Sequence, residues 1–119
     1  IQIEPQNKRG RETDKVKRVV KFKIDFTLLK NITAQTGERI LYVRITKPDN
    51  SILTKNSSDT FEYENRRLPY SIKKYVEYTG EEQTVTVYWN VEEYLYAGEY
   101  RVDIFAEGTL IGQRNFVLE

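Results

Sequence analysis

Residues 95–104 read Leu-Tyr-Ala-Gly-Glu-Tyr-Arg-Val-Asp-Ile, and this stretch decides the fold that we predict for the chain. Gly98 stands where the backbone can bend at least cost, because glycine has no Cβ atom. After it, Tyr100, Val102 and Ile104 recur at every second position, which places the three side chains on one face of a β-strand. The stretch therefore predicts a bend that leads directly into a half-buried strand.

The pattern Leu95-x-x-Gly98-x-Tyr100-x-Val102 resembles the tyrosine corner of immunoglobulin-like and fibronectin-like sandwiches. In such a corner, a tyrosine near the start of a late strand donates a hydrogen bond back to the nearby backbone. The resemblance implies that role for the hydroxyl group of Tyr100.

Other segments alternate apolar and polar residues, which is the pattern of strands buried on one face. In the first of them, residues 16–29, we expect the core to receive Val20, Phe22, Ile24, Phe26 and Leu28. Trp89, the only tryptophan, is expected near the centre of the core. Residues 91–97 form either a helical turn or a loop, and Gly112 is a candidate β-bulge. The remaining predicted strands are residues 40–46, 51–55, 60–63, 71–78, 83–90, 99–106 and 109–118.

Seven or eight strands separated by turns, without a long helix, predict an all-β fold. We expect an antiparallel immunoglobulin-like β-sandwich with Greek-key connections, and a closed barrel is the structural alternative. The sandwich domain is predicted to span residues 16–119. Residues 1–15 are predicted to be a linker or N-terminal arm, in which Ile1 and Ile3 allow a short edge strand.

The composition of the 119 residues fits one domain and argues against an enzyme. The sequence has no cysteine and no histidine, so it lacks a thiol nucleophile, the usual general base and the commonest metal ligand. We therefore expect no catalytic residues, no cofactor and no metal. No apolar run approaches the roughly 20 residues that span a bilayer. Because the chain starts at Ile1 and contains no methionine, we expect it to be part of a longer protein.

Two polar turn segments carry oxygens that calcium sites use, and two asparagines match a modification pattern. The oxygens of residues 49–51 and 56–59 are of the kind that bind Ca²⁺, but the glycine and the terminal glutamate of a calcium loop are missing. These residues are also the ordinary occupants of turns, so we predict no metal there. Asn31 and Asn56 each begin a triplet that matches the N-glycosylation pattern.

Positive charge is concentrated at the start of the chain. Residues 1–30 carry nine Lys or Arg and four Asp or Glu, a net charge of +5, whereas the remainder carries −4. A basic segment of this kind predicts contact with an anion such as a nucleic acid or a charged surface. The simpler interpretation, which the sequence favours, is a solvated arm and a strand with lysines outward. The candidate anion contacts are Lys8, Arg9, Arg11, Lys21 and Lys23.

The chain has nine tyrosines, a residue that protein interfaces favour because it offers a large contact area at low entropic cost. Tyrosine is also a good strand former, so the number alone is no proof of an interface. Tyr94 and Tyr96, which adjoin the predicted corner, are the preferred candidates for contact with a protein, followed by Tyr42 and Tyr88.

Two long stretches carry a further resemblance. Residues 22–53 include Phe-Lys-Ile-Asp-Phe-Thr-Leu-Leu-Lys-Asn and Leu-Tyr-Val-Arg-Ile-Thr-Lys-Pro-Asp-Asn, and residues 98–118 begin Gly-Glu-Tyr-Arg-Val-Asp-Ile-Phe. Together they resemble immunoglobulin-like or macroglobulin-like accessory domains of large bacterial proteins. They are also similar to domains that follow coiled coils in Bacteroidetes proteins labelled as chromosome-partition or segregation proteins. The resemblance implies a module without catalytic residues.

These observations predict a non-catalytic interaction or spacer module of a larger bacterial protein. The expected partner is a protein, a neighbouring domain of the same chain or a second copy. One alternative is nucleic-acid or anionic-surface binding through the basic segment. Another is a carbohydrate-binding accessory module that uses exposed tyrosines and Trp89, and burial of Trp89 would count against it.

Overall fold

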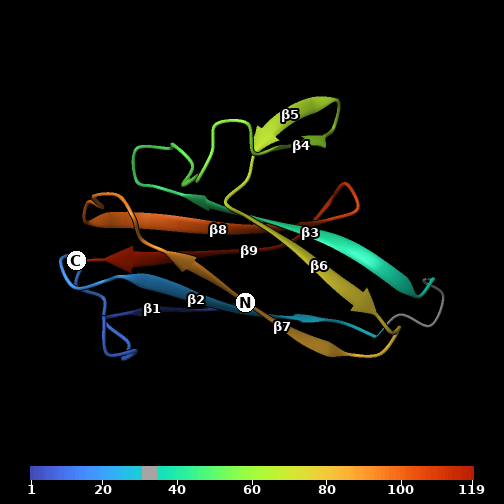
Figure 1. Cartoon of the computed structure of the whole chain (residues 1–119), viewed down its shortest axis with the longest axis horizontal. Coiled ribbons are helices and arrows are strands. Elements are labelled where there is room, and N and C mark those ends of the chain that lie inside the picture. The colour runs from blue at the N-terminus through green and yellow to red at the C-terminus, as the bar shows by residue number, and fades with distance from the viewer. Residues whose placement is uncertain (31–34) are drawn as a thin grey trace.

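The computed structural model describes residues 1–30 and 35–119 of the chain, and the predicted glycosylation acceptor Asn31 lies outside them. The described residues form nine β-strands rather than seven or eight (Figure 1). The strands are β1 (Gln2–Gln6), β2 (Lys21–Leu28), β3 (Gly37–Thr46), β4 (Thr60–Tyr63), β5 (Arg66–Pro69), β6 (Ile72–Tyr78), β7 (Gln83–Asn90), β8 (Gly98–Ala106) and β9 (Thr109–Leu118).

The strands form two antiparallel sheets that pack together and a separate hairpin. One sheet has three strands in the order β1-β2-β7, and the other has four in the order β6-β3-β8-β9. The β4–β5 hairpin projects beyond the four-stranded sheet (Figure 1). Within residues 1–30 and 35–119 no strand pairing joins the two sheets, so the closed-barrel alternative is wrong.

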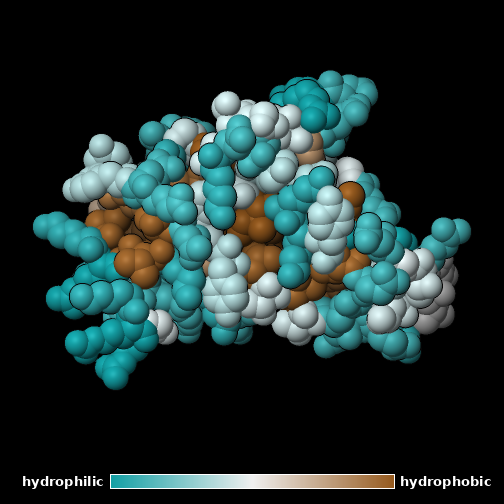
Figure 2. Space-filling view, in the orientation of Figure 1, coloured by the Kyte–Doolittle hydropathy of each residue, from teal (hydrophilic) through white to brown (hydrophobic). Residues whose placement is uncertain are grey.

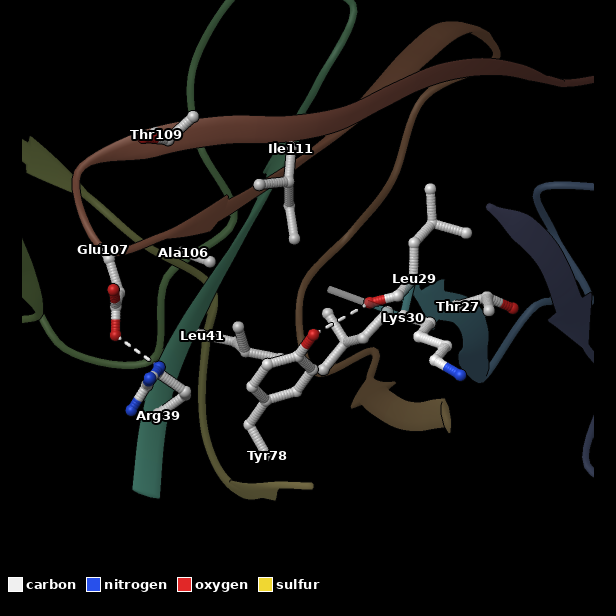
Figure 3. Close-up of a pocket in the computed structure, with 11 residues that line it drawn as sticks. Thr27, Leu29, Lys30, Arg39, Leu41, Tyr78, Ala106, Glu107, Thr109 and Ile111 are labelled. Carbon is white, nitrogen blue, oxygen red and sulfur yellow. Dashed lines mark hydrogen bonds and ion pairs between the residues drawn. The ribbon is translucent and has the colours of Figure 1, made fainter. Parts of the chain in front are cut away.

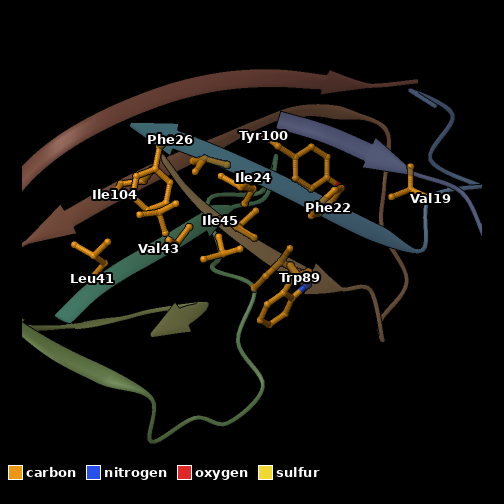
Figure 4. Packing of buried hydrophobic residues seen from close by; sticks show 14 of the residues in the cluster. Val19, Phe22, Ile24, Phe26, Leu41, Val43, Ile45, Trp89, Tyr100 and Ile104 are labelled. Atoms are coloured by element: carbon orange, nitrogen blue, oxygen red, sulfur yellow. The ribbon is translucent and has the colours of Figure 1, made fainter. Parts of the chain in front are cut away.

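The core lies between the two sheets, where the predicted inward faces of the strands meet (Figure 4). Alternation along each strand places every second side chain on this side of its sheet, which is why the sequence pattern identifies most of the core. The buried core residues include Phe22, Ile24, Phe26, Leu41, Val43, Ile45, Val85, Val87, Trp89, Tyr100, Val102 and Ile104.

The first long strand was predicted to begin at residue 16, and this prediction is wrong. Residues 15–19 form a turn, in which the backbone N–H of Val19 donates to the carbonyl of Lys15 at 3.2 Å, and β2 begins only at Lys21. The strand alternation therefore does not extend back to Val20. As a result Val20 is 42% exposed, and Val19 takes its place in the core.

Three local predictions have different outcomes. Residues 51–55 are not a strand and make only an isolated pairing between Ile52 and Thr46. Residues 91–97 contain no helical turn, so the loop alternative is confirmed. The predicted bulge is present, because Ile104 pairs with Gly112 and the next residue pairs with Leu110, which leaves Ile111 as the extra residue.

The first fifteen residues contribute to the sandwich instead of forming only a linker or arm. Residues 2–6 are β1 and pair with β2, which confirms the edge strand that Ile1 and Ile3 suggested. Further along, the backbone N–H of Val16 donates to the carbonyl of Glu119 at 2.8 Å. The N–H of Glu119 in turn donates to the carbonyl of Asp14 at 2.7 Å, so residues 14–16 hold Glu119 in place.

This junction predicts a measurable pH dependence. The Lys15 ammonium group donates a hydrogen bond at 2.8 Å to the Glu119 carboxylate, and this bond and the lysine charge lower the pKa of that carboxyl group. A lowered carboxyl pKa stabilises the folded state at neutral pH, and the contribution is lost as the pH falls through the lowered value. We expect Lys15→Ala to return the pKa of Glu119 towards its ordinary value in an NMR titration. An unchanged Glu119 titration in that variant would contradict the contact.

Candidate protein-contact surface

The predicted tyrosine corner is present and anchors the loop between β7 and β8. Tyr100 is 1% exposed, and its hydroxyl donates a hydrogen bond of 2.6 Å to the backbone carbonyl of Tyr96. Burial raises the pKa of this hydroxyl, so it stays protonated and able to donate at neutral pH. The loop is thereby fixed at one point to a side chain of the core.

A second set of contacts ties the same loop to the turn that follows β3. Gly98 has a φ of +143°, and a Cβ atom there would lie 2.8 Å from Cγ of Pro48. The ammonium group of Lys47 lies 2.9 Å from the carboxylate of Glu93. In the turn itself, hydrogen bonds from Ser51 hold the pKa of Asp49 below its ordinary value. The loop is therefore supported from two sides.

The loop presents two tyrosines to the solvent. Leu95 is buried and lies between Tyr94 and Tyr96 in sequence, and the two flanking side chains are 76% and 69% exposed. Their rings meet edge-on, with centroids 5.3 Å apart and planes at 67°. We call Tyr94 and Tyr96 the tyrosine pair. It forms an exposed aromatic surface on an anchored loop.

The corner hydrogen bond supports a stability prediction. We expect Tyr100→Phe to lower the free energy of unfolding by about 1–2 kcal/mol, because the carbonyl of Tyr96 loses its hydroxyl donor. Urea denaturation measures this change, and Tyr94→Phe is the matched control because its side chain is exposed. Equal stability of Tyr100→Phe and the wild-type chain would show that the corner bond does not hold the loop.

The other two tyrosine candidates lie elsewhere. Tyr42 is half-buried and stacks on Phe61 of β4 at 4.5 Å, so the β4–β5 hairpin covers part of it. Tyr88 is 51% exposed on the outer face of β7, with the ammonium group of Lys21 5.1 Å from its ring centre. The structure therefore brings together Tyr94 and Tyr96 only, and Tyr42 and Tyr88 belong to separate surfaces.

The basic candidates fall into two neighbouring places. Lys8, Arg9 and Arg11 are exposed in a turn that the side chain of Asn7 caps by accepting from the N–H of Arg9 at 2.9 Å. Lys21 pairs in register with Gln6, directly before that turn, whereas Lys23 pairs with Glu4. Four of the five basic residues thus lie at one end of the three-stranded sheet, and Lys23 stands opposite a carboxylate.

A pocket of about 660 Å³ opens beside the turn between β8 and β9, and the tyrosine pair precedes the other end of β8. Figure 3 shows the residues that line the pocket. Leu29, Leu41 and Ile111 give it an apolar lining. Of its three charged side chains, Arg39 and Glu107 form an ion pair of 2.6 Å with each other, and the ammonium group of Lys30 lies 3.5 Å from the carboxylate of Glu81. Their charges are therefore already balanced, and the site is suited to an apolar group.

Three further observations concern metal ligands, helix length and the position of Trp89. Among residues 1–30 and 35–119, no three acidic, histidine or cysteine side chains are placed to hold a metal ion. No helix of the described chain is long and apolar enough to cross a membrane. Trp89 is 3% exposed, which confirms its predicted place in the core and removes it as a platform for a sugar ring.

Sequence reasoning found the tyrosine pair but missed the residues that support it. The sequence marks Gly98 as a bend and residues 49–51, directly after Pro48, as a turn. The contact between Pro48 and Gly98 joins positions far apart in the sequence, and so does the ion pair between Lys47 and Glu93. Only the pairing of β3 with β8 brings these two loops together.

Fold and surface together define the chain as a small antiparallel β-sandwich domain. It belongs to the family described as "Domain of unknown function (DUF8428)", whose model matches residues 1–119. No curated protein matches the sequence. Among solved structures, the fold is similar to part of a β-glucosidase from Kluyveromyces marxianus, with a TM-score of 0.56 and 17% identity. That alignment covers 99% of this chain and 14% of the glucosidase chain, and at this identity it shows the fold alone.

Proposed function

We propose that this domain is an immunoglobulin-like sandwich that serves as a non-catalytic docking or spacer module of a larger bacterial protein. Its partner is a protein or a neighbouring domain. The chromosome-partition context that the sequence resemblance implies stays a prediction, because the family and structural matches do not address it.

The strand arrangement supports the immunoglobulin-like part of the proposal. Sheets of three and four strands face each other across one core, as in sandwiches of that class. The corner formed by Tyr100 precedes the last hairpin, where such sandwiches carry it. One difference is the core tryptophan, which lies on β7 instead of the third strand.

The exposure of the tyrosine pair carries the docking part of the proposal. Tyrosine is enriched among the residues that contribute most to binding energy at protein interfaces. Here two tyrosines project from a loop whose backbone accepts the hydrogen bond of Tyr100. The ion pair between Lys47 and Glu93 joins this loop to the neighbouring turn. Binding a partner would therefore cost little ordering of the loop, which favours affinity.

The experiment compares single alanine variants of the tyrosine pair with an exposed tyrosine elsewhere. Tyr94→Ala and Tyr96→Ala should each retain the wild-type unfolding temperature, because both rings are largely exposed. Each should reduce at least tenfold the amount of one specific protein captured from an extract of the source cells. Tyr75→Ala, on β6 and 55% exposed, is the control and should capture the wild-type amount. Equal capture by all three variants would reject the tyrosine pair as the docking surface.

The anion-binding alternative remains a second candidate, supported by the way Lys21 continues the cluster of Lys8, Arg9 and Arg11. Contacts with phosphates give an affinity that falls steeply as the salt concentration rises. DNA binding at low salt that disappears in a variant with all four residues changed to glutamine would favour it. Because Trp89 is buried, a carbohydrate-binding site on this domain would have only the exposed tyrosines as stacking platforms.

A further inference from the structure

The two sheets have four edge strands among the described residues, and three of them carry features that oppose pairing with another strand. Charged residues, proline, bulges and short length are the usual devices by which proteins protect sheet edges. β1 is short and contains Glu4 and Pro5, and β6 contains Lys73, Lys74 and Glu77. β9 has the bulge at Ile111 and the charge of Arg114. Such strands are poor templates for a new strand.

β7 is different from the other three edges. Its sequence, Gln-Thr-Val-Thr-Val-Tyr-Trp-Asn, has no charge, no proline and no glycine, and it is rich in β-branched and aromatic residues. Its register with β2 is continuous from Gln83 to Asn90, without a bulge. In the part of the chain that the structure describes, its backbone pairs only with β2. β7 therefore offers a row of free backbone groups along a regular strand.

The surroundings define which part of this edge is free. At the Asn90 end, the ammonium group of Lys55 lies 5.6 Å from the centre of the Trp89 ring, which places a positive charge beside that end of the strand. On the outer face, Thr84 and Tyr88 are exposed. β6 and β7 both cross the side of the molecule that faces the viewer in Figure 1, and hydrophobic residues reach the surface along the middle of this side (Figure 2). Residues 83–88 thus form an uncharged edge beside an apolar surface.

We propose that residues 84–88 of β7 pair in antiparallel fashion with the same residues of a second copy of this chain, with Thr86 opposite Thr86 of the partner. This inference rests on the proposed docking role but uses a surface separate from the tyrosine pair. An uncharged strand is complementary to itself, because no register of the antiparallel pair places like charges opposite each other. The product is a two-fold dimer with one continuous sheet, β1-β2-β7 joined to β7-β2-β1 of its partner.

Sedimentation velocity over a wide concentration range tests the proposal on the 119-residue chain. We expect a monomer–dimer equilibrium and, on dimerisation, slower amide hydrogen exchange in residues 84–88. Thr86→Lys should weaken dimerisation by about tenfold or more, because it introduces a like-charge pair in the register that matches residue 86 with itself. The monomer should tolerate this lysine, since Asp25 faces position 86 on β2 and accepts a hydrogen bond from it in the wild-type chain.

Two further variants keep the test decisive. Thr84→Lys changes an exposed position of the same edge and replaces Thr86→Lys if that variant does not fold. Thr109→Lys makes the same change on β9 and should leave dimerisation unchanged. A chain that is monomeric at every concentration would overturn the proposal, as would a dimer that neither β7 variant weakens. A dimer lost only in Tyr94→Ala or Tyr96→Ala would assign self-association to the tyrosine pair instead.

Discussion

Phe22→Ala is expected to lower the free energy of unfolding by about 4 kcal/mol, the largest effect of any substitution considered for this chain. Phe22 lies on β2 and is fully buried. Its ring meets that of Phe116 edge-on at 5.3 Å and lies 6.3 Å from that of Tyr100. Both neighbours belong to the opposite sheet, so removal of the ring leaves a cavity where the sheets meet.

Urea denaturation measures this loss, and the dependence of the unfolding free energy on urea concentration should stay close to that of the wild-type chain. Val117→Ala is the control, because Val117 is 55% exposed, and we expect it to change stability by about 0.5 kcal/mol or less. A loss of less than about 1 kcal/mol for Phe22→Ala would mean that the two sheets do not share the core described above.

Gly98→Ala is expected to destabilise the domain by about 3 kcal/mol, from backbone strain and a steric clash together. The φ of +143° is a conformation that residues with a side chain rarely adopt, and a Cβ atom would meet Cβ and Cγ of Pro48 at 2.9 Å and 2.8 Å. Gly108→Ala separates the two causes. Gly108 has a φ of +74° but no neighbour within 4 Å of a Cβ position, so this control carries only the backbone cost of about 1 kcal/mol.

The contact with Pro48 has its own test in a double variant. Pro48→Ala removes Cγ, the atom closest to the introduced methyl group. If the clash contributes, the combined loss in Gly98→Ala/Pro48→Ala should be smaller than the sum of the two single losses. Strict additivity would contradict the close approach between the loop and the turn.

The interior of the sandwich was predictable from the sequence because strand alternation is a local signal. Val85, Val87 and Trp89 follow it without interruption, and β7 begins and ends where it was predicted. Val20 shows where this reasoning fails. It continues the alternation of β2 in sequence, and its backbone still bonds to Gln6 and Val91, but the turn at residues 15–19 directly before it puts Val19 in the core instead. A pattern of apolar residues does not reveal where a turn changes which side chain faces the core.

The candidate contact surface was predictable only in part, for a related reason. Tyr94 and Tyr96 could be identified because they flank Leu95 beside a recognisable corner. Tyr42 could not be excluded, since its cover comes from Phe61 in a hairpin with few sequence signals. The unprotected edge of β7 also needed the structure, because a strand becomes an edge only through the order of strands in its sheet. Long-range pairing is the information that a local pattern lacks.

The most direct test of the central claim is site-specific photo-crosslinking in the source cells. A photoreactive phenylalanine analogue replaces Tyr94 in the full-length protein that contains this domain, and in a separate variant it replaces the exposed Tyr75. We predict one discrete crosslinked protein from position 94 and none from position 75. No adduct from position 94, or the same adducts from both positions, would contradict the assignment of the tyrosine pair as the docking surface.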